Sequence, residues 1–401
     1  MGEMILELKE PEYMQAFVCR EGSCTDTCCA GWDIVFDAAA CRRYAADGRM
    51  QKRFAARVMR NTEQLPNGEI PFARVRLTEK KRCPFLRTDG LCEIQYESEE
   101  QNLSETCRTY PRVIHCWGDQ LAEWSLHISC PMAAQLVLDA KRPMVFSSRR
   151  IEMQQLRGMR FEAAGEELRF SHTVVRGMLI YLLQLQEYGI RERLLLANAF
   201  FNQSVDLAAS EAADLQELTA VYRQLAEQPD KVRIYCAELA GAQELQLEML
   251  RSLLWHRLQG TAVSTEFLQQ AQRFMELWQL QWSSQAAKAS SALYLEELLR
   301  YEQEADRGEQ QIWENYLVNQ VFRDIYLTEP MADRMRWHQV VFQFLLQRAL
   351  VLTDRGFFAG SAAAQREIMQ RTAKAVEHDR LYLEQAAGFL ALLEQGGMQF
   401  L

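Results

Sequence analysis

The sequence of 401 residues lacks long hydrophobic runs and any excess of positive charge. Its most apolar later stretch, Met178 to Leu185, is far shorter than the roughly 20 residues that span a bilayer. The 45 lysines and arginines are outnumbered by 54 acids, giving a net charge of −9, whereas nucleic-acid binders normally present a basic face. The densest basic stretch, Arg74 to Arg82, is short, and we interpret it as a solvated loop. We therefore expect neither a transmembrane segment nor a nucleic-acid partner.

The start of the chain also lacks the pattern of a signal peptide, because residues 1–6 have neither a basic start nor a long apolar run. Of eleven cysteines, ten lie in the first 130 residues, and only Cys236 follows. In a secreted protein such clustering would suggest disulfides. Here the odd count and the missing secretion signal favour metal ligation or redox chemistry. We expect a cytoplasmic protein, and the sequence leaves peripheral membrane association and oligomer formation open.

The composition changes near Pro131. Six of the nine prolines occur up to that residue, and short apolar runs alternate there with glycine and proline turns. Such turns suit a loop-rich domain organised around a metal rather than a large core. Within it, the apolar spacing predicts a helix over 37–60 and a strand over 72–77.

Beyond Pro131 the sequence shows helical periodicity in segment after segment, interrupted only by Pro143, Pro229 and Pro330. We therefore predict a mainly α fold with two domains. Residues 1–136 form a small, loop-rich, cysteine-rich metal-binding domain. Residues 137–401 form a larger all-α domain that binds substrate or a partner.

The cysteines of the first domain fall in four segments. They are Cys19, Cys24, Cys28 and Cys29 in the first, Cys83 and Cys92 in the second, Cys107 in the third and Cys130 in the fourth. The side chains of the adjacent Cys28 and Cys29 should diverge. Cys29 therefore either reaches the same metal through an irregular backbone or serves a second centre.

Three interpretations of these cysteines compete. Structural zinc typically uses two close CxxC pairs, and this sequence has none. An iron–sulfur cluster also takes four thiolates and accepts varied spacings. Inert buried thiols explain Cys41, Cys116 and Cys236 but hardly all ten N-terminal cysteines. Metal binding is favoured, and spacing alone leaves iron–sulfur and zinc open.

Three motifs together resemble the flagellin lysine N-methylase family, whose cysteine-rich part is related to zinc- or iron-chelating domains with a CxxxCC signature. They are Cys24-x3-Cys28-Cys29-Ala-Gly-Trp32, Cys83-Pro-Phe-Leu86 with Leu91-Cys92-Glu-Ile-Gln95, and the segment 103–112 with Ser129-Cys130-Pro131. The resemblance is dense from about residue 13 to 136. It is thin afterwards, where Glu314-Asn-Tyr-Leu317 resembles a motif of the family's helical part.

This resemblance implies methyl transfer from S-adenosylmethionine to lysine side chains of flagellin, with a 4Fe–4S cluster required. The positions that match the family pattern are Cys19, Cys24, Cys28, Cys29, Cys83, Cys92, Cys107 and Cys130. One cluster needs only four of these eight, and the sequence does not say which four. Cys41 and Cys116 fall outside the pattern.

The S-adenosylmethionine site and the catalytic base stay unassigned. The sequence has no strand–glycine–helix unit of the doubly wound methyltransferase type. It also lacks the CxxxCxxC of radical enzymes, because Gly31 stands where the third cysteine belongs. His115 and His127 are candidates to bind or tune a cluster, although a lone histidine is more often structural.

Other residues and other functions stay open as well. Arg108 and Arg112 are candidates to bind the cofactor carboxylate or donate to cluster sulfurs, and ordinary capping or pairing is an equal alternative. Trp32 either shields a cluster or belongs to the core. The alternative function is a non-enzymatic zinc- or iron-binding adaptor with a helical interaction domain, and an electron-transfer protein is a third.

Overall fold

The computed structural model describes most of the chain, including all eleven cysteines. The described residues are 5–31, 34–48, 50–62, 72–97, 103–156, 158–162, 167–207, 212–239, 244–259, 263–278, 284–358 and 361–395. Trp32 lies outside them. Among the described residues, no helix has both the length and the hydrophobicity needed to cross a membrane.

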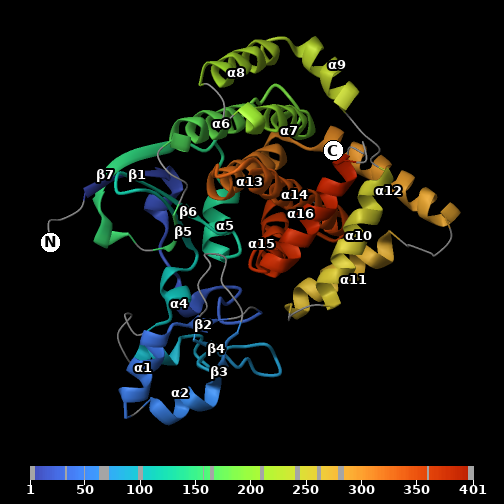
Figure 1. Ribbon diagram of the computed structural model, residues 1–401. Helices are drawn as coiled ribbons and strands as arrows, with labels where there is room; N and C mark the ends of the chain where they lie inside the picture. The colour runs from blue at the N-terminus through green and yellow to red at the C-terminus, as the bar shows by residue number, and fades with distance from the viewer. Residues whose placement is uncertain are drawn as a thin grey trace.

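A five-stranded mixed sheet lies near the N-terminus, in the order β7-β1-β6-β5-β8 (Figure 1). Its strands are β1 (Ile5–Pro11), β5 (Arg112–Trp117), β6 (Leu121–Leu126), β7 (Phe146–Glu152) and β8 (Met159–Glu162). Strand β1 pairs with β6 in parallel and with β7 in antiparallel fashion. Strand β5 is antiparallel to β6 and parallel to β8. The sheet therefore takes strands from both sides of residue 136, and the division of the chain there stays a prediction.

The cysteine-rich segment between β1 and β5 forms a separate small layer at one end of the molecule (Figure 1). It holds a three-stranded sheet in the order β2-β4-β3, made of β2 (Val35–Phe36), β3 (Val58–Arg60) and β4 (Ala73–Val75). Its helices are α1 (Ala38–Ala46), α2 (Gln51–Arg57), α3 (Glu93–Glu97) and α4 (Glu105–Thr109). The strand predicted over 72–77 is confirmed in β4.

The single helix predicted over 37–60 is wrong in its length, because the chain breaks it twice. Asp37 caps the start of α1, where its carboxylate accepts from Ala40 N at 2.5 Å. Asp47 ends that helix and accepts from Met50 N at 3.3 Å, so it starts α2 in a new direction. The remaining residues 58–60 extend as β3, which pairs with β4.

The rest of the chain is helical, which confirms the mainly α fold class. The helices are α5 (Pro131–Leu138), α6 (Glu167–Leu183), α7 (Ile190–Leu207), α8 (Ala212–Ala226), α9 (Pro229–Leu239), α10 (Glu244–Gln259), α11 (Thr265–Leu277), α12 (Ser284–Glu304), α13 (Arg307–Asp324), α14 (Pro330–Phe358), α15 (Ala362–Val376) and α16 (Arg380–Gln395). Helix α13 lies at their centre, and every residue from Gln311 to Arg323 is buried. Polar residues occupy part of this buried helix, and buried polar groups need hydrogen-bond partners. Glu314, for example, accepts from Arg193 of α7 at 2.7 Å.

Candidate metal centre and the cavity beside it

The first cysteine segment, 19–29, is a loop that two side chains of helix α15 contact. Lys374 Nζ lies 2.6 Å from Asp26 Oδ1 and donates to the carbonyl of Thr27 at 2.8 Å. Gln370 Nε2 donates to Asp26 Oδ2 at 3.0 Å. Two residues of one helix thus fix the loop directly beside Cys28 and Cys29.

The second cysteine segment packs against the first through two glycines. A Cβ atom on Gly90 would lie 2.9 Å from Gly22 O, and Gly90 has a φ of +83°, so both the close approach and the backbone conformation require glycine there. The amide of Cys83 donates to the carbonyl of Cys29 at 2.7 Å. An antiparallel bridge between Leu86 and Cys92 then folds the segment back on itself.

The last two cysteines stand at the beginnings of helices. Cys107 lies in the first turn of α4, where its amide donates to Ser104 Oγ at 3.1 Å. Cys130 is the N-cap residue of α5, and Pro131 follows as its first residue, the position that tolerates proline best. Both cysteines are thereby placed by regular structure, whereas the first two segments are placed by loop packing.

These four segments converge on one cavity of about 210 Å³. Seven of the eight family cysteines line it: Cys19, Cys24, Cys28, Cys29, Cys92, Cys107 and Cys130. The eighth, Cys83, is buried and packs in the same apolar cluster as Cys29, Cys92 and Cys107. The structure therefore brings together the residues that the sequence pattern selected. Cys41 packs on that cluster without lining the cavity, and Cys116 and Cys236 lie in other cores.

Two groups of neighbours can be distinguished within the eight. The inner group, Cys29, Cys83, Cys92 and Cys107, packs against the aromatic cluster around Phe36, Phe54 and Phe85. Burial, with repulsion from neighbouring thiolates, raises the pKa of Cys83 and of Cys107. The outer group consists of the other four, Cys19, Cys24, Cys28 and Cys130, and Cys130 packs in a different apolar cluster, with Leu126. The thiol of Cys28 links the two groups, because it interacts with Cys29 and Cys107 as well as with Cys130.

The thiol pKa values show that most of these thiolates are unfavourable when no cation is bound. Burial raises the pKa of Cys83 to about 12 and that of Cys130 to about 11. A hydrogen bond from Cys28, with help from Thr27 and Lys374, lowers the pKa of Cys29 to about 7, and the same bond raises that of Cys28. A metal ion would reverse the raised values, because it binds the thiolate form.

The spacing of the sulfurs bears on which metal centre fits. Among the described residues, no three cysteine sulfurs lie within 4.8 Å of one another. A tetrahedral zinc site with bonds of about 2.3 Å would hold them about 3.8 Å apart. The thiolates of a 4Fe–4S cluster stand farther apart, because each binds a different iron. The described cysteines therefore do not stand, as placed, in the arrangement of one tetrahedral zinc ion.

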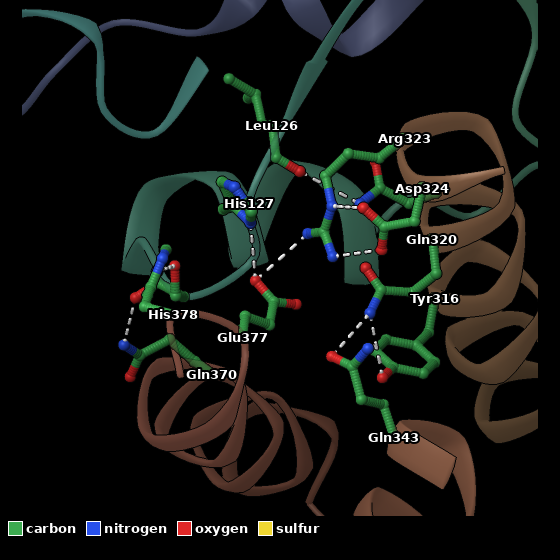
Figure 2. A network of polar contacts seen from close by, with 12 residues as sticks. Leu126, His127, Tyr316, Gln320, Arg323, Asp324, Gln343, Gln370, Glu377 and His378 are labelled. Atoms are coloured by element: carbon green, nitrogen blue, oxygen red, sulfur yellow. Dashed lines mark hydrogen bonds and ion pairs between the residues drawn. The ribbon is translucent and has the colours of Figure 1, made fainter. Parts of the chain in front are cut away.

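A second cavity of about 250 Å³ lies next to the first, and the segment Tyr110–Arg112 lines both. Its polar wall is made by residues from the β6–α5 connection, the end of α13 and the α15–α16 turn (Figure 2). His127 Nδ1 lies 2.9 Å from Glu377 Oε2, and Arg323 Nη1 donates to the same oxygen at 3.1 Å. Arg323 also holds Asp324 through two bonds of 2.7 Å.

The environment of this wall fixes the charge of its members. Burial tends to raise the pKa of Glu377, but Arg323 and His127 overcome it and lower that pKa to about 2. Burial and the neighbouring His127 lower the pKa of His378 to about 3. The carboxylate is therefore ionised and the imidazole of His378 neutral at pH 7. His378 Nε2 is 2.9 Å from Ser129 Oγ, which in turn lies 3.1 Å from the hydroxyl of Tyr110.

Of the histidines and arginines singled out in the sequence, Arg108 and Arg112 line the cysteine cavity and the two histidines do not. His115 Nε2 lies 2.6 Å from the carbonyl of Arg323, and its ring packs 4.5 Å from Tyr326. Arg108 pairs with Glu105, and the guanidinium of Arg112 lies 4.8 Å from the centre of the Phe17 ring. Both His115 and His127 line the second cavity.

Sequence reasoning missed Glu377 and His378 altogether. They lie some 250 residues after His127, inside a region whose composition predicts only helices. The apolar spacing runs through 373–393 and predicts one helix there, whereas the structure ends α15 at Val376 and begins α16 at Arg380. The two residues lie in the turn between these helices, so no sequence signal marked them.

The fold and the site together define a mainly helical protein with a cysteine-lined cavity at its N-terminal end. Residues 176–399, more than half of the chain, match the family described as FliB lysine N-methylase C-terminal domain. The chain belongs to this family, which confirms the resemblance drawn from the motifs. No solved structure matches the chain.

Three relatives are each 27% identical to the chain over part of its length. They are lysine-N-methylases of Salmonella typhimurium and Salmonella choleraesuis, over 154 residues, and the flagellar biosynthetic protein FliU of Salmonella muenchen, over 146 residues. The match to each of the two methylases covers 37% of both chains. The match to FliU covers 36% of this chain and 85% of that protein.

Proposed function

We propose that this protein is a protein-lysine N-methyltransferase that uses S-adenosylmethionine, carries an iron–sulfur cluster, and acts on lysine side chains of flagellin. Family membership is the observation that carries the activity, because the matched family is named for lysine N-methylation. The name of the FliU relative, a flagellar biosynthetic protein, supports a flagellar substrate. The thiols suit the reducing cytoplasm, where disulfides are rare.

The cysteine cavity supports the cluster. Eight thiols from four segments meet beside an apolar aromatic cluster, and four thiolates hold one 4Fe–4S centre. We propose the eight family cysteines as the ligand set, with the inner group as the more water-excluded half. A bound cluster would supply one-electron chemistry at this place. Lys374 and Gln370 hold the loop that carries Cys28 and Cys29.

The second cavity supports a two-part active site. A lysine side chain has an unperturbed pKa of about 10.4 and attacks only as the neutral amine, so the protein has to desolvate or deprotonate it. A cavity with a buried carboxylate and three imidazoles, sharing the wall Tyr110–Arg112 with the cysteine cavity, provides such a place next to the metal centre. Its lining combines perturbed titratable groups with apolar walls, as active sites commonly do.

The test is anaerobic purification followed by metal and sulfide analysis, with electron paramagnetic resonance before and after reduction. Labelled S-adenosylmethionine is then supplied with flagellin, and methyl-lysine is identified by mass spectrometry. We expect a brown protein with iron and sulfide and transfer of label to flagellin. A colourless protein with stoichiometric zinc and no transfer would refute the proposal. The adaptor alternative requires no saturable S-adenosylmethionine binding in calorimetry.

A further inference from the structure

The carboxylate of Glu377 uses only one of its two oxygens within the network of Figure 2. Oε2 accepts from His127 and Arg323, whereas Oε1 is buried with no hydrogen-bond partner. The side chain is only 1% exposed, so water in bulk does not reach it. Buried carboxylate oxygens are normally paired. An unpaired one on a cavity wall marks a place where a donor group is received.

The charges around Glu377 leave room for one more cation. Arg323 is the guanidinium that reaches Glu377, and it is already shared with Asp324 through two bonds. One guanidinium is thus shared between the buried carboxylate of Glu377 and that of Asp324, which is 28% exposed. A cation that enters the cavity would add a second positive charge beside Glu377.

The other arginines that line the cavity have partners of their own. Arg336 bonds the carbonyl of Tyr326 at 2.7 Å and pairs with Asp333. Arg380 lies 3.6 Å from Glu384, on its own helix. Arg112, as described, lies over Phe17. Each of these arginines thus has a contact other than Glu377.

Glu377 is the residue of the cavity lining whose carboxylate has an unpaired oxygen. Figure 2 shows this oxygen on the side that faces Tyr316 and Gln343. Gln343 also lines the cavity, where its Oε1 accepts from Gln320 Nε2 at 3.3 Å. The unpaired oxygen of Glu377 therefore suits a ligand that brings a donor group.

The remaining walls suit a chain of methylene groups. Val35, Pro111, Val113 and Leu383 line the cavity together with the rings of Tyr110 and Tyr326. An alkyl stem fits such walls, and an ammonium at its end would meet the unpaired oxygen. A primary ammonium carries three donors and one positive charge, which suit the unpaired oxygen and the negative charge of Glu377.

We propose that this cavity receives the side chain of the acceptor lysine, with Glu377 Oε1 as the acceptor that anchors its ε-ammonium group. The inference rests on the proposed function, because it takes lysine as the substrate. It places the amine on one side of Tyr110–Arg112 and the cysteine cavity on the other. A divalent metal at His127, Glu377 and His378, whose ligand atoms lie within 4.8 Å of one another, is less favourable because Arg323 already occupies Glu377 Oε2.

The test measures binding of Nα-acetyl-lysine amide to the anaerobically purified protein by saturation-transfer NMR. Nα-acetyl-norleucine amide, which has the alkyl stem without the amine, is the matched control ligand. Glu377→Gln keeps the shape of the side chain and removes its charge. Glu367→Gln makes the same change on the exposed face of α15, where Glu367 pairs with Arg371 at 3.1 Å.

We expect saturable binding of the lysine amide but not of the norleucine amide. Glu377→Gln should weaken it roughly tenfold or more, since truncating a buried charged contact costs at least that much. Glu367→Gln should leave it unchanged, and both variants should keep wild-type iron content. Equal binding of the two ligands, or unchanged binding in Glu377→Gln, overturns the proposal. So does one zinc or manganese ion retained by wild type and lost in Glu377→Gln.

Two further measurements keep the result interpretable. If Glu377→Gln does not fold, Leu383→Phe narrows the cavity without removing a charge, and it should weaken lysine binding as well. Methyl transfer to flagellin separates the two proposals. Transfer with an unchanged KM in Glu377→Gln refutes the pocket alone. Lysine binding without any transfer by wild type refutes the proposed function and leaves the pocket supported.

Discussion

Lys374 Nζ lies 2.6 Å from Asp26 Oδ1 and so joins helix α15 to the loop of the CxxxCC motif. The side chain of Lys374 is only 7% exposed, and its second contact is the carbonyl of Thr27. A residue near the end of the chain therefore determines where Cys28 and Cys29 stand. The helical part therefore contributes to the candidate metal centre, because it holds in place the loop that carries Cys28 and Cys29.

Replacing Lys374 by methionine should lower both metal content and stability. The variant keeps the apolar stem but leaves Asp26 without its cation, which we expect to cost about 2 kcal/mol in the free energy of unfolding. The pKa of Cys29 should rise, because Lys374 helps to lower it. Urea denaturation and iron per chain measure the two effects. Lys231→Met on the exposed face of α9 is the control, and an equal effect there would contradict this role of Lys374.

Serine substitutions should separate the inner and outer cysteine groups. Serine at Cys83, Cys92 or Cys107 places a poor ligand in the group that packs against the apolar cluster, so we expect cluster binding to be lost. Serine at Cys19, which is exposed, should leave part of the iron bound. Iron and sulfide analysis of the anaerobic variants measures this. Cys41→Ser, in the same cluster but outside the cavity, should behave as wild type, and comparable loss there would speak against the assignment.

Stability should fall as the pH drops from 7 toward 4. Burial lowers the pKa of His115 and of His172 from 6.5 to about 4. Between these values the unfolded chain binds more protons than the folded one, so acid favours unfolding, by up to about 1.4 kcal/mol per pH unit for each imidazole. Urea denaturation at pH 7.5, 6.5 and 5.5 gives the slope. His172→Phe should reduce it, and a slope equal to that of wild type would contradict the burial effect.

Glu314→Gln should destabilise the helical part strongly. Glu314 and Arg193 form an ion pair of 2.7 Å in which the side chains are 1% and 2% exposed. Removing one charge leaves the other buried and unpaired, which we expect to cost about 3 kcal/mol or more. Glu297→Gln breaks an exposed pair with Arg300 and should cost less than about 1 kcal/mol. Thermal unfolding of both variants tests the difference, and similar melting temperatures would refute it.

Much of the architecture could be predicted from the sequence. Helical periodicity beyond Pro131 is a local property, so it predicted most helices correctly. Glu314 and Asn315 were singled out only as part of a family motif. The structure shows why they matter physically: Glu314 holds Arg193, and Asn315 donates to the carbonyl of Ala140 at 2.8 Å. Strand β7 was missed, because it is an edge strand with exposed charged residues and no clear alternation.

The sequence by itself determined which residues can bind a metal. The clustering of cysteines and the CxxxCC motif are properties of residue type and spacing. They select eight thiols without any knowledge of the fold. They cannot say how those thiols meet in space, because that depends on how four separate segments pack together.

Only the tertiary structure decided what stands beside those thiols. Glu377 meets His127 across 250 residues, and Lys374 meets Asp26 across 348. No local pattern encodes such contacts, since they depend on how α15 packs against α5 and the cysteine loop. The physical reason is that burial and charge pairing arise only when distant segments pack together. These two effects turn an ordinary glutamate at a helix end into an ionised, half-paired group on the wall of a cavity.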